Sequence, residues 1–80
     1  MASLVELTEF LVRAIVREPD AVSVHNAERN GNPVLVINVD EQDRGAVIGR
    51  QGRTIKAIET VLDAASAGAE RRPGLDVQTS

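Results

Sequence analysis

Two glycines three residues apart, near the middle of the chain, constrain its fold more than any other feature. Gly49 and Gly52 lie in the run Val-Ile-Gly-Arg-Gln-Gly-Arg-Thr-Ile at residues 47–55, with β-branched apolar residues at both ends. Glycine has no Cβ, so the chain can turn sharply at both positions and another backbone can approach closely. The flanking apolar residues indicate that a core lies beneath the turn. The pattern therefore predicts a short polar loop between two packed helices.

This predicted loop carries groups that suit an anion. The first N–H groups of a helix lack intrahelical partners and carry the positive end of its dipole, so phosphate is a common ligand there. Arg50 and Arg53 add charge-assisted donors, Gln51 adds a hydrogen bond, and Lys56 follows one turn later. Two plainer explanations stay open. The glycines also allow two helices to pack closely, and the polar side chains also suit an ordinary solvated surface.

The same residues resemble the GxxG loop of KH domains, which clamps the backbone of about four single-stranded nucleotides. The resemblance covers essentially all 80 residues and is to the small bacterial proteins made of a single KH domain, the KhpA-like family. It implies one KH domain over residues 1–80, with its GxxG loop at residues 49–52. It also implies that aliphatic side chains beside the loop and along the strand at residues 36–39 form the floor of a groove for bases, and the sequence leaves open which of them face the groove and which the interior. The residues implied to contact RNA are Gly49, Arg50, Gln51, Gly52, Arg53, Lys56, Ile48 and Ile55.

The first half of the chain predicts one helix and a hairpin. Ser3 and Glu6 form a capping box before apolar residues at helical spacing, and Pro19 is expected to end this helix. Val22 and Val24 alternate with polar residues as in a strand. Asn30-Gly31 is a strong hairpin signal. The apolar run at residues 33–39 suits a central strand that is covered on one face and shielded on the other.

The second half predicts two helices and a last strand. Asp40 or a neighbour is expected to cap a short helix that ends near Ile48, and a longer helix is expected from about residue 53 to residue 67. Gly68 is a plausible stop for this helix, and residues 71–74 lead to a strand at residues 75–78.

The resulting order, α-β-β-α-α-β, is that of a type II KH domain. A hairpin followed by a two-helix crossover returns the third strand parallel to the second, by the usual right-handed path. We therefore expect a two-layer α+β domain in which three helices cover one face of a three-stranded mixed sheet.

Length and composition restrict the class of protein. A chain of 80 residues buries roughly 60–65% of its unfolded surface, so self-association would help its stability. The absence of cysteine excludes disulfides and thiolate-bound metals. There is no apolar run of about 20 residues and no export-signal pattern, so we expect a cytoplasmic protein that does not cross a membrane.

Charge is unevenly distributed along the chain. The net charge is −3, yet residues 47–58 hold three cations and no acid. A local basic site on an acidic body predicts few phosphate contacts and modest affinity for nucleic acid. Phe10 is the only aromatic residue, so stacking of bases on aromatic rings is largely ruled out.

Other candidate sites are weaker. Gly45 extends a glycine series that superficially resembles a nucleotide-binding loop, but the Lys-Ser/Thr ending of a P-loop is missing. His25 has no acidic partner at ligand spacing. Asp40, Glu41 and Asp43 suit the N-terminus of a helix better than a metal site. We therefore predict no enzymatic activity, no cofactor and no metal.

Two functions remain. The first is a binder of single-stranded RNA, which by the family resemblance would act as an RNA chaperone or post-transcriptional regulator. The second, also implied by the family, is a protein-interaction adaptor that works as a homodimer or as the partner of a larger KH-containing protein.

Overall fold

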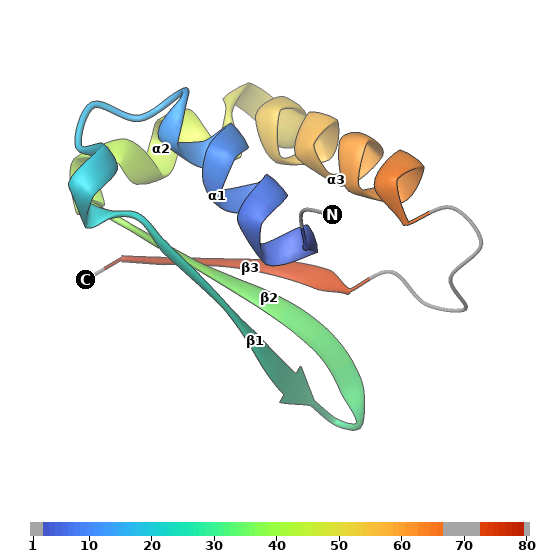
Figure 1. Cartoon of the computed structure of the whole chain (residues 1–80). Helices are drawn as coiled ribbons and strands as arrows, with labels where there is room; N and C mark the ends of the chain where they lie inside the picture. Colours follow the sequence, from blue (N-terminus) through green and yellow to red (C-terminus); the bar gives the residue numbers. More distant parts are fainter. Residues whose placement is uncertain (1–2, 67–72, 80) are drawn as a thin grey trace.

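The helices cover one face of the sheet, as Figure 1 shows. The structure, a computed structural model, describes residues 3–66 and 73–79. Within these ranges it confirms the predicted α+β class and the order α-β-β-α-α-β. The helices are α1 (Leu4–Arg13), α2 (Arg44–Ile48) and α3 (Arg53–Ala65), and the strands are β1 (Ser23–Arg29), β2 (Asn32–Val39) and β3 (Gly74–Thr79). Three short 3₁₀ turns join them: η1 (Pro19–Ala21), η2 (Glu41–Asp43) and η3 (Arg50–Gly52).

The sheet has the order β1-β2-β3, so β2 is the central strand, as its apolar run predicts. β1 pairs antiparallel with β2, and β3 pairs parallel with β2. The hairpin between β1 and β2 turns at Asn30 and Gly31, whose φ angles are 53° and 79°. Two consecutive left-handed residues are what a type I′ turn requires, so the Asn-Gly signal is confirmed.

The core lies between the sheet and the helices. Leu35, Ile37 and Val39 of β2 face the helices and have no exposed surface, while Val36 among them is only 3% exposed. Val36 faces the other side of the sheet, in register with His25 of β1 and Asp76 of β3. The central strand is therefore covered on one face and, at Val36, shielded on the other, as predicted. The core cluster consists of Val12, Val22, Val24, Leu35, Ile37, Val39, Val47, Ile58 and Leu62.

An ion pair connects the two edge strands. Arg29 of β1 and Asp76 of β3 form a salt bridge although β2 lies between their strands. The Nε2 group of Gln78 also donates to the Asp76 carboxylate, at 3.1 Å. These side chains belong to the sheet face that the helices leave uncovered.

The first helix ends earlier than the sequence predicted. Its last residue is Arg13, and Pro19 instead begins η1. The prediction that Pro19 ends the helix is therefore wrong. The physical reason lies in the intervening segment, where the amides of Arg17 and Glu18 donate to the carboxylate of Asp43 and so leave the helical hydrogen-bond pattern.

The end of α3 is close to the predicted one. Its last helical residue is Ala65, and the hydroxyl of Ser66 donates to the carbonyl oxygen of Leu62 at 2.7 Å. The predicted stop at Gly68 and the connection at residues 71–72 lie outside the described residues. In the described parts of the chain, no helix has the length and apolar character needed to cross a bilayer.

Candidate nucleic-acid interface

The loop between α2 and α3 turns through three residues with positive φ. Gly49 has φ 79° and ψ 166°, Gln51 has φ 57° and ψ 27°, and Gly52 has φ 73° and ψ 16°. Gln51 is the unusual member, because the left-handed region costs a residue with a Cβ about 1–2 kcal/mol. The two helices that flank the loop hold it in this conformation.

The two glycines serve different physical needs. A Cβ built on Gly49 would lie 2.3 Å from the Oγ1 atom and 2.6 Å from the backbone nitrogen of Thr54, so the first turn of α3 excludes any side chain there. A Cβ on Gly52 would meet nothing closer than Ile55 Cγ2 at 3.9 Å. Gly49 is therefore required by space and by conformation, and Gly52 by conformation alone.

Several backbone amides that the sequence predicts to be free for a ligand at this loop are already hydrogen-bonded within the loop and its flanking helix. The amide of Gly49 donates to the carbonyl of Gly45 at 2.8 Å and closes α2. The amide of Gly52 donates to Gly49 at 3.1 Å, and that of Arg53 donates to Arg50. The expectation of unpartnered amides at the start of α3 thus fails at these two positions.

The polar side chains of the loop point into solvent. Arg50, Gln51, Arg53 and Lys56 are all exposed, and Gly49 and Gly52 are half-buried beneath them. Across residues 3–66 and 73–79, no carboxylate forms an ion pair with Arg50, Arg53 or Lys56. The salt bridges found in that part of the chain lie on α1 and across the sheet. The loop therefore presents three positive charges that no described acid neutralises.

The aliphatic residues of the expected groove divide into two groups. Ile48 and Ile55 are half-buried and flank the loop, so part of each remains accessible. Ile37 and Val39 of β2 have no exposed surface. The structure therefore places these two side chains in the interior, packed under the helices, which the sequence had left open.

The acidic residues before α2 have two separate roles. Asp40 caps η2, since its Oδ1 accepts the amide of Gln42 at 2.9 Å, and this confirms the expected cap. Asp43 makes no capping bond to α2 and is only 2% exposed. Its two carboxylate oxygens accept the amides of Arg17 and Glu18, each at 3.0 Å. The capping interpretation of Asp43 is wrong, and no local pattern in the sequence indicates a bond to residues so distant in the chain.

The remaining candidate ligands are dispersed. His25 is exposed on β1. In the described residues, no three His, Cys, Asp or Glu side chains lie close enough together to hold a metal ion.

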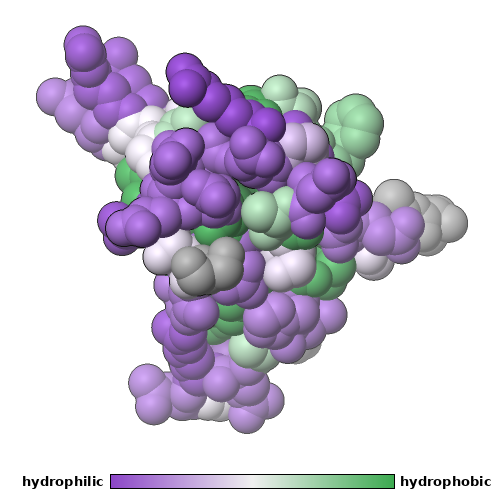
Figure 2. All heavy atoms as spheres, turned by 90° about the vertical axis from the view of Figure 1, so that its left-hand side faces the viewer, coloured by the Kyte–Doolittle hydropathy of each residue, from purple (hydrophilic) through white to green (hydrophobic). Residues whose placement is uncertain are grey.

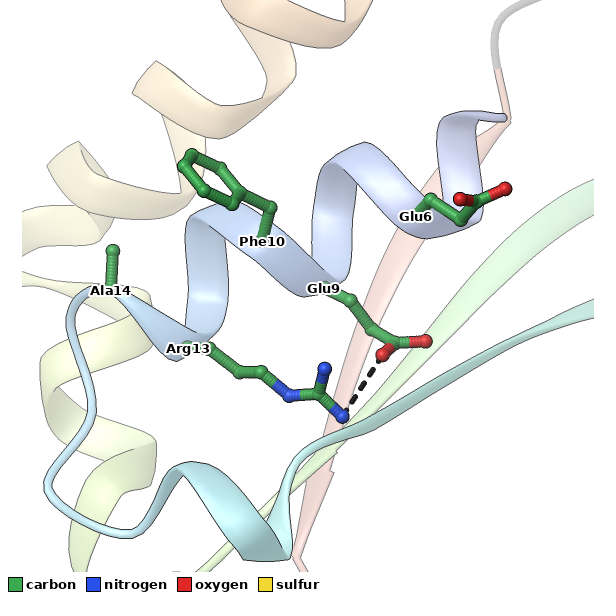
Figure 3. Close-up of a pocket in the computed structure, with 5 residues that line it drawn as sticks. All are labelled: Glu6, Glu9, Phe10, Arg13 and Ala14. Atoms are coloured by element: carbon green, nitrogen blue, oxygen red, sulfur yellow. Dashed lines mark ion pairs between the residues drawn. The ribbon is translucent and has the colours of Figure 1, made fainter. Parts of the chain in front are cut away.

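An apolar surface lies beside the loop, on the outer side of α1 and α3. Phe10 is 71% exposed, and Ile15 and Val61 are each 41% exposed. Figure 3 shows Phe10 and Ala14 projecting to one side of α1, away from the Glu9–Arg13 ion pair. A groove of about 180 Å³ between the two helices is lined by Leu11, Ile15, Thr54, Ala57, Ile58 and Val61.

The chain is similar in sequence to known KH-domain proteins over most of its length. The KhpA/KhpB KH-domain family model matches residues 5–77. An RNA-binding protein KhpA of Borreliella burgdorferi is 37% identical over 73 residues, which cover 91% of this chain and 89% of that protein. An RNA-binding protein KhpA of Streptomyces coelicolor is 40% identical over 74 residues, covering 92% and 94%.

A solved structure has the same fold. It is Era in complex with MgGDPNP and nucleotides 1506–1542 of 16S ribosomal RNA, with a TM-score of 0.59 and 24% identity. The match covers 95% of this chain and 29% of the Era chain, so nearly the whole chain corresponds to one part of that larger protein.

Proposed function

Because this chain belongs to the KhpA/KhpB family of KH domains, we propose that it binds single-stranded RNA through the loop at residues 49–52. Relatives of nearly the same length bear the name RNA-binding protein, which supports a binding module over an enzyme. In this proposal the protein works in the cytoplasm as an RNA chaperone or post-transcriptional regulator.

The observation that carries the proposal is the exposed charge on a strained turn, which no acid among the described residues pairs with. Arg50 and Arg53 supply guanidinium donors for phosphate, and Gln51 is held in a left-handed conformation at the tip between them. Conformational strain of this kind is retained where the surrounding structure and a function require it. Lys56 adds a third charge one turn along α3, and Ile48 and Ile55 offer apolar contact to a neighbouring base.

Replacement of Arg50 and Gln51 by aspartates tests the site. We expect the double variant to lose measurable RNA binding in a fluorescence titration with a short single strand, because it places carboxylates where phosphates would lie. Circular dichroism should stay unchanged, since both side chains are exposed and aspartate tolerates a left-handed φ.

The matched control replaces one arginine and one glutamine outside the loop by aspartates. Gln42→Asp with Arg44→Asp makes the same change in net charge at two exposed positions before the loop, and we expect it to bind RNA far better than the loop variant. If the loop variant binds RNA as well as this control does, the loop is not the site.

The apolar surface on α1 and α3 favours a second candidate function, that of a protein-interaction adaptor. The occupant would be a second copy of this chain or a larger KH-containing partner. Burial of Phe10, Ile15 and Val61 would add apolar area that a domain of this size has difficulty supplying alone.

Solution mass distinguishes this role. We expect the wild-type protein to have the mass of a dimer in light scattering, with and without RNA, and Phe10→Asp to have that of a monomer. Thr60→Asp, at an exposed position of α3 outside the groove, is the control and should stay dimeric. A monomeric wild-type protein would contradict the homodimer. A complex with a larger KH-containing protein would then be tested by a binding assay with that partner.

A further inference from the structure

A buried carboxylate anchors the short helix that leads into the loop. Asp43 immediately precedes α2, is 2% exposed, and binds the backbone of the segment after α1 through both of its oxygens. Burial of a carboxylate is costly unless hydrogen bonds compensate it, and here two amide donors do so. The bond joins two segments that lie far apart in the sequence.

α2 depends on such tertiary anchors. It has five residues, and a helix that short is not stable by itself. Val47 holds it to the core on one side, and Asp43 ties its first turn to residues 17–18. Gly49 follows directly, with its amide bonded to Gly45 of the same helix. Because α2 is little more than one turn long, a displacement of its first turn also moves the loop that follows it.

We propose that Asp43 is a positioning residue for nucleic-acid binding: its two hydrogen bonds to the amides of Arg17 and Glu18 set the placement of α2 and hence of the loop at residues 49–52. This proposal deepens the proposed function and rests on it. The side chains of Arg17 and Glu18 take no part, because only their backbone amides bind the carboxylate.

The position of the Asp43 anchor explains why it can act on the loop without contacting RNA. It lies at the end of the molecule where η1 and the start of α2 meet, and the surface there is mostly hydrophilic (Figure 2). Val47 supplies the apolar packing of α2, and the two hydrogen bonds of Asp43 add directional positioning to it. Binding groups need this kind of support to keep their geometry.

Asp43→Asn is the test, and Asp40→Asn is its matched control. Both remove one negative charge close to the basic loop. Asparagine at position 40 can still cap the helix, because its side-chain oxygen accepts a backbone amide. At position 43 the asparagine NH₂ group would face a backbone N–H, so one of the two hydrogen bonds is lost. The quantity to measure is the dissociation constant for a short single-stranded RNA. The temperature is chosen so that every variant is folded, as judged by its thermal unfolding curve. The ¹⁵N–¹H amide shifts of Gly49–Gly52 are recorded without RNA.

We expect Asp43→Asn to bind RNA about tenfold more weakly than the wild-type protein and to shift the loop amides. Asp40→Asn should do neither. If Asp43→Asn does not fold, Asp43→Glu, which keeps the carboxylate but displaces it by one methylene group, takes its place, with Asp40→Glu as its control.

The outcomes separate this inference from the proposed function. A folded Asp43→Asn protein with unchanged loop amides overturns the positioning role, whatever its RNA affinity. Shifted loop amides with unchanged RNA affinity also overturn it. Shifted loop amides in a protein whose wild type binds no RNA would support the control of loop geometry by Asp43 and contradict the proposed function.

Discussion

At the scale of single residues, the GxxG loop owes its shape to two glycines that are not equivalent. Gly49 lies against the first turn of α3 and has φ and ψ values that only glycine adopts readily. Gly52 has room for a Cβ, which would make only an ordinary contact with Ile55, and it has an ordinary left-handed conformation. The distinction is invisible in a sequence motif that treats both positions alike.

Substitution at each glycine should reveal this difference. We expect Gly49→Ala to lower the free energy of unfolding by about 2–4 kcal/mol, because strain adds to a clash with Thr54. We expect Gly52→Asn to cost less than about 1 kcal/mol, since asparagine tolerates left-handed backbone. Urea unfolding followed by circular dichroism measures both values. Equal losses would show that the close contact at Gly49 is relieved by movement of α3.

Single-residue roles are predictable from the sequence only where the relevant contact is local. Ser3 accepts the amide of Glu6 at 3.1 Å and Asp40 caps η2, as their spacing indicates. The same reasoning wrongly makes Asp43 a cap, because its partners are reached only through the fold. The left-handed φ of Gln51 is also unpredictable, since glutamine has no preference for that region.

At the scale of elements, the hairpin between β1 and β2 is specified by its turn. Asn30 and Gly31 form a two-residue connection, and Arg29 is in register with Asn32 across it. Periodicity and turn residues predict the three strands of the described sheet and both longer helices, and the two-helix crossover predicts the parallel pairing of β3 with β2. The end of α1 was predicted too late, since a proline marks where a helix must stop and not where tertiary contacts make it stop.

A pair of glycine substitutions tests the turn. A Cβ added at Gly31 or at Gly74 would lie in open space, but only Gly31 has a positive φ. We expect Gly31→Ala to destabilise the protein by about 1–2 kcal/mol and Gly74→Ala to be neutral or slightly stabilising. Thermal unfolding by calorimetry gives both shifts. A neutral Gly31→Ala would mean that the hairpin tip relaxes to another turn type.

At the scale of the whole molecule, charge is separated between a basic loop and an acidic remainder. The chain has a net charge of −3, and the three cations of the loop region have no acidic partner among the described residues. Long-range attraction of RNA should therefore be weak, with affinity dependent on a few close contacts.

Salt dependence measures how many phosphates those contacts neutralise. With Arg50, Arg53 and Lys56 engaged, we expect a log–log slope near −2 for a single strand, so affinity falls about fifteenfold between 50 and 200 mM salt. Fluorescence titrations at four or more salt concentrations give the slope. A slope steeper than about −4 would require further basic residues in the interface.

The parallel pairing of β2 with β3 has a consequence for how the molecule assembles. Residues 34–39 lie in register with residues 74–79, so the sheet closes only after both intervening helices have been made and folded back. Closing so long a loop is slow compared with forming the hairpin or α1. During synthesis, the last strand has to leave the ribosome before the sheet can be completed. Until then the loop at residues 49–52 rests on an unfinished support, and we expect any binding competence of the loop to arise late.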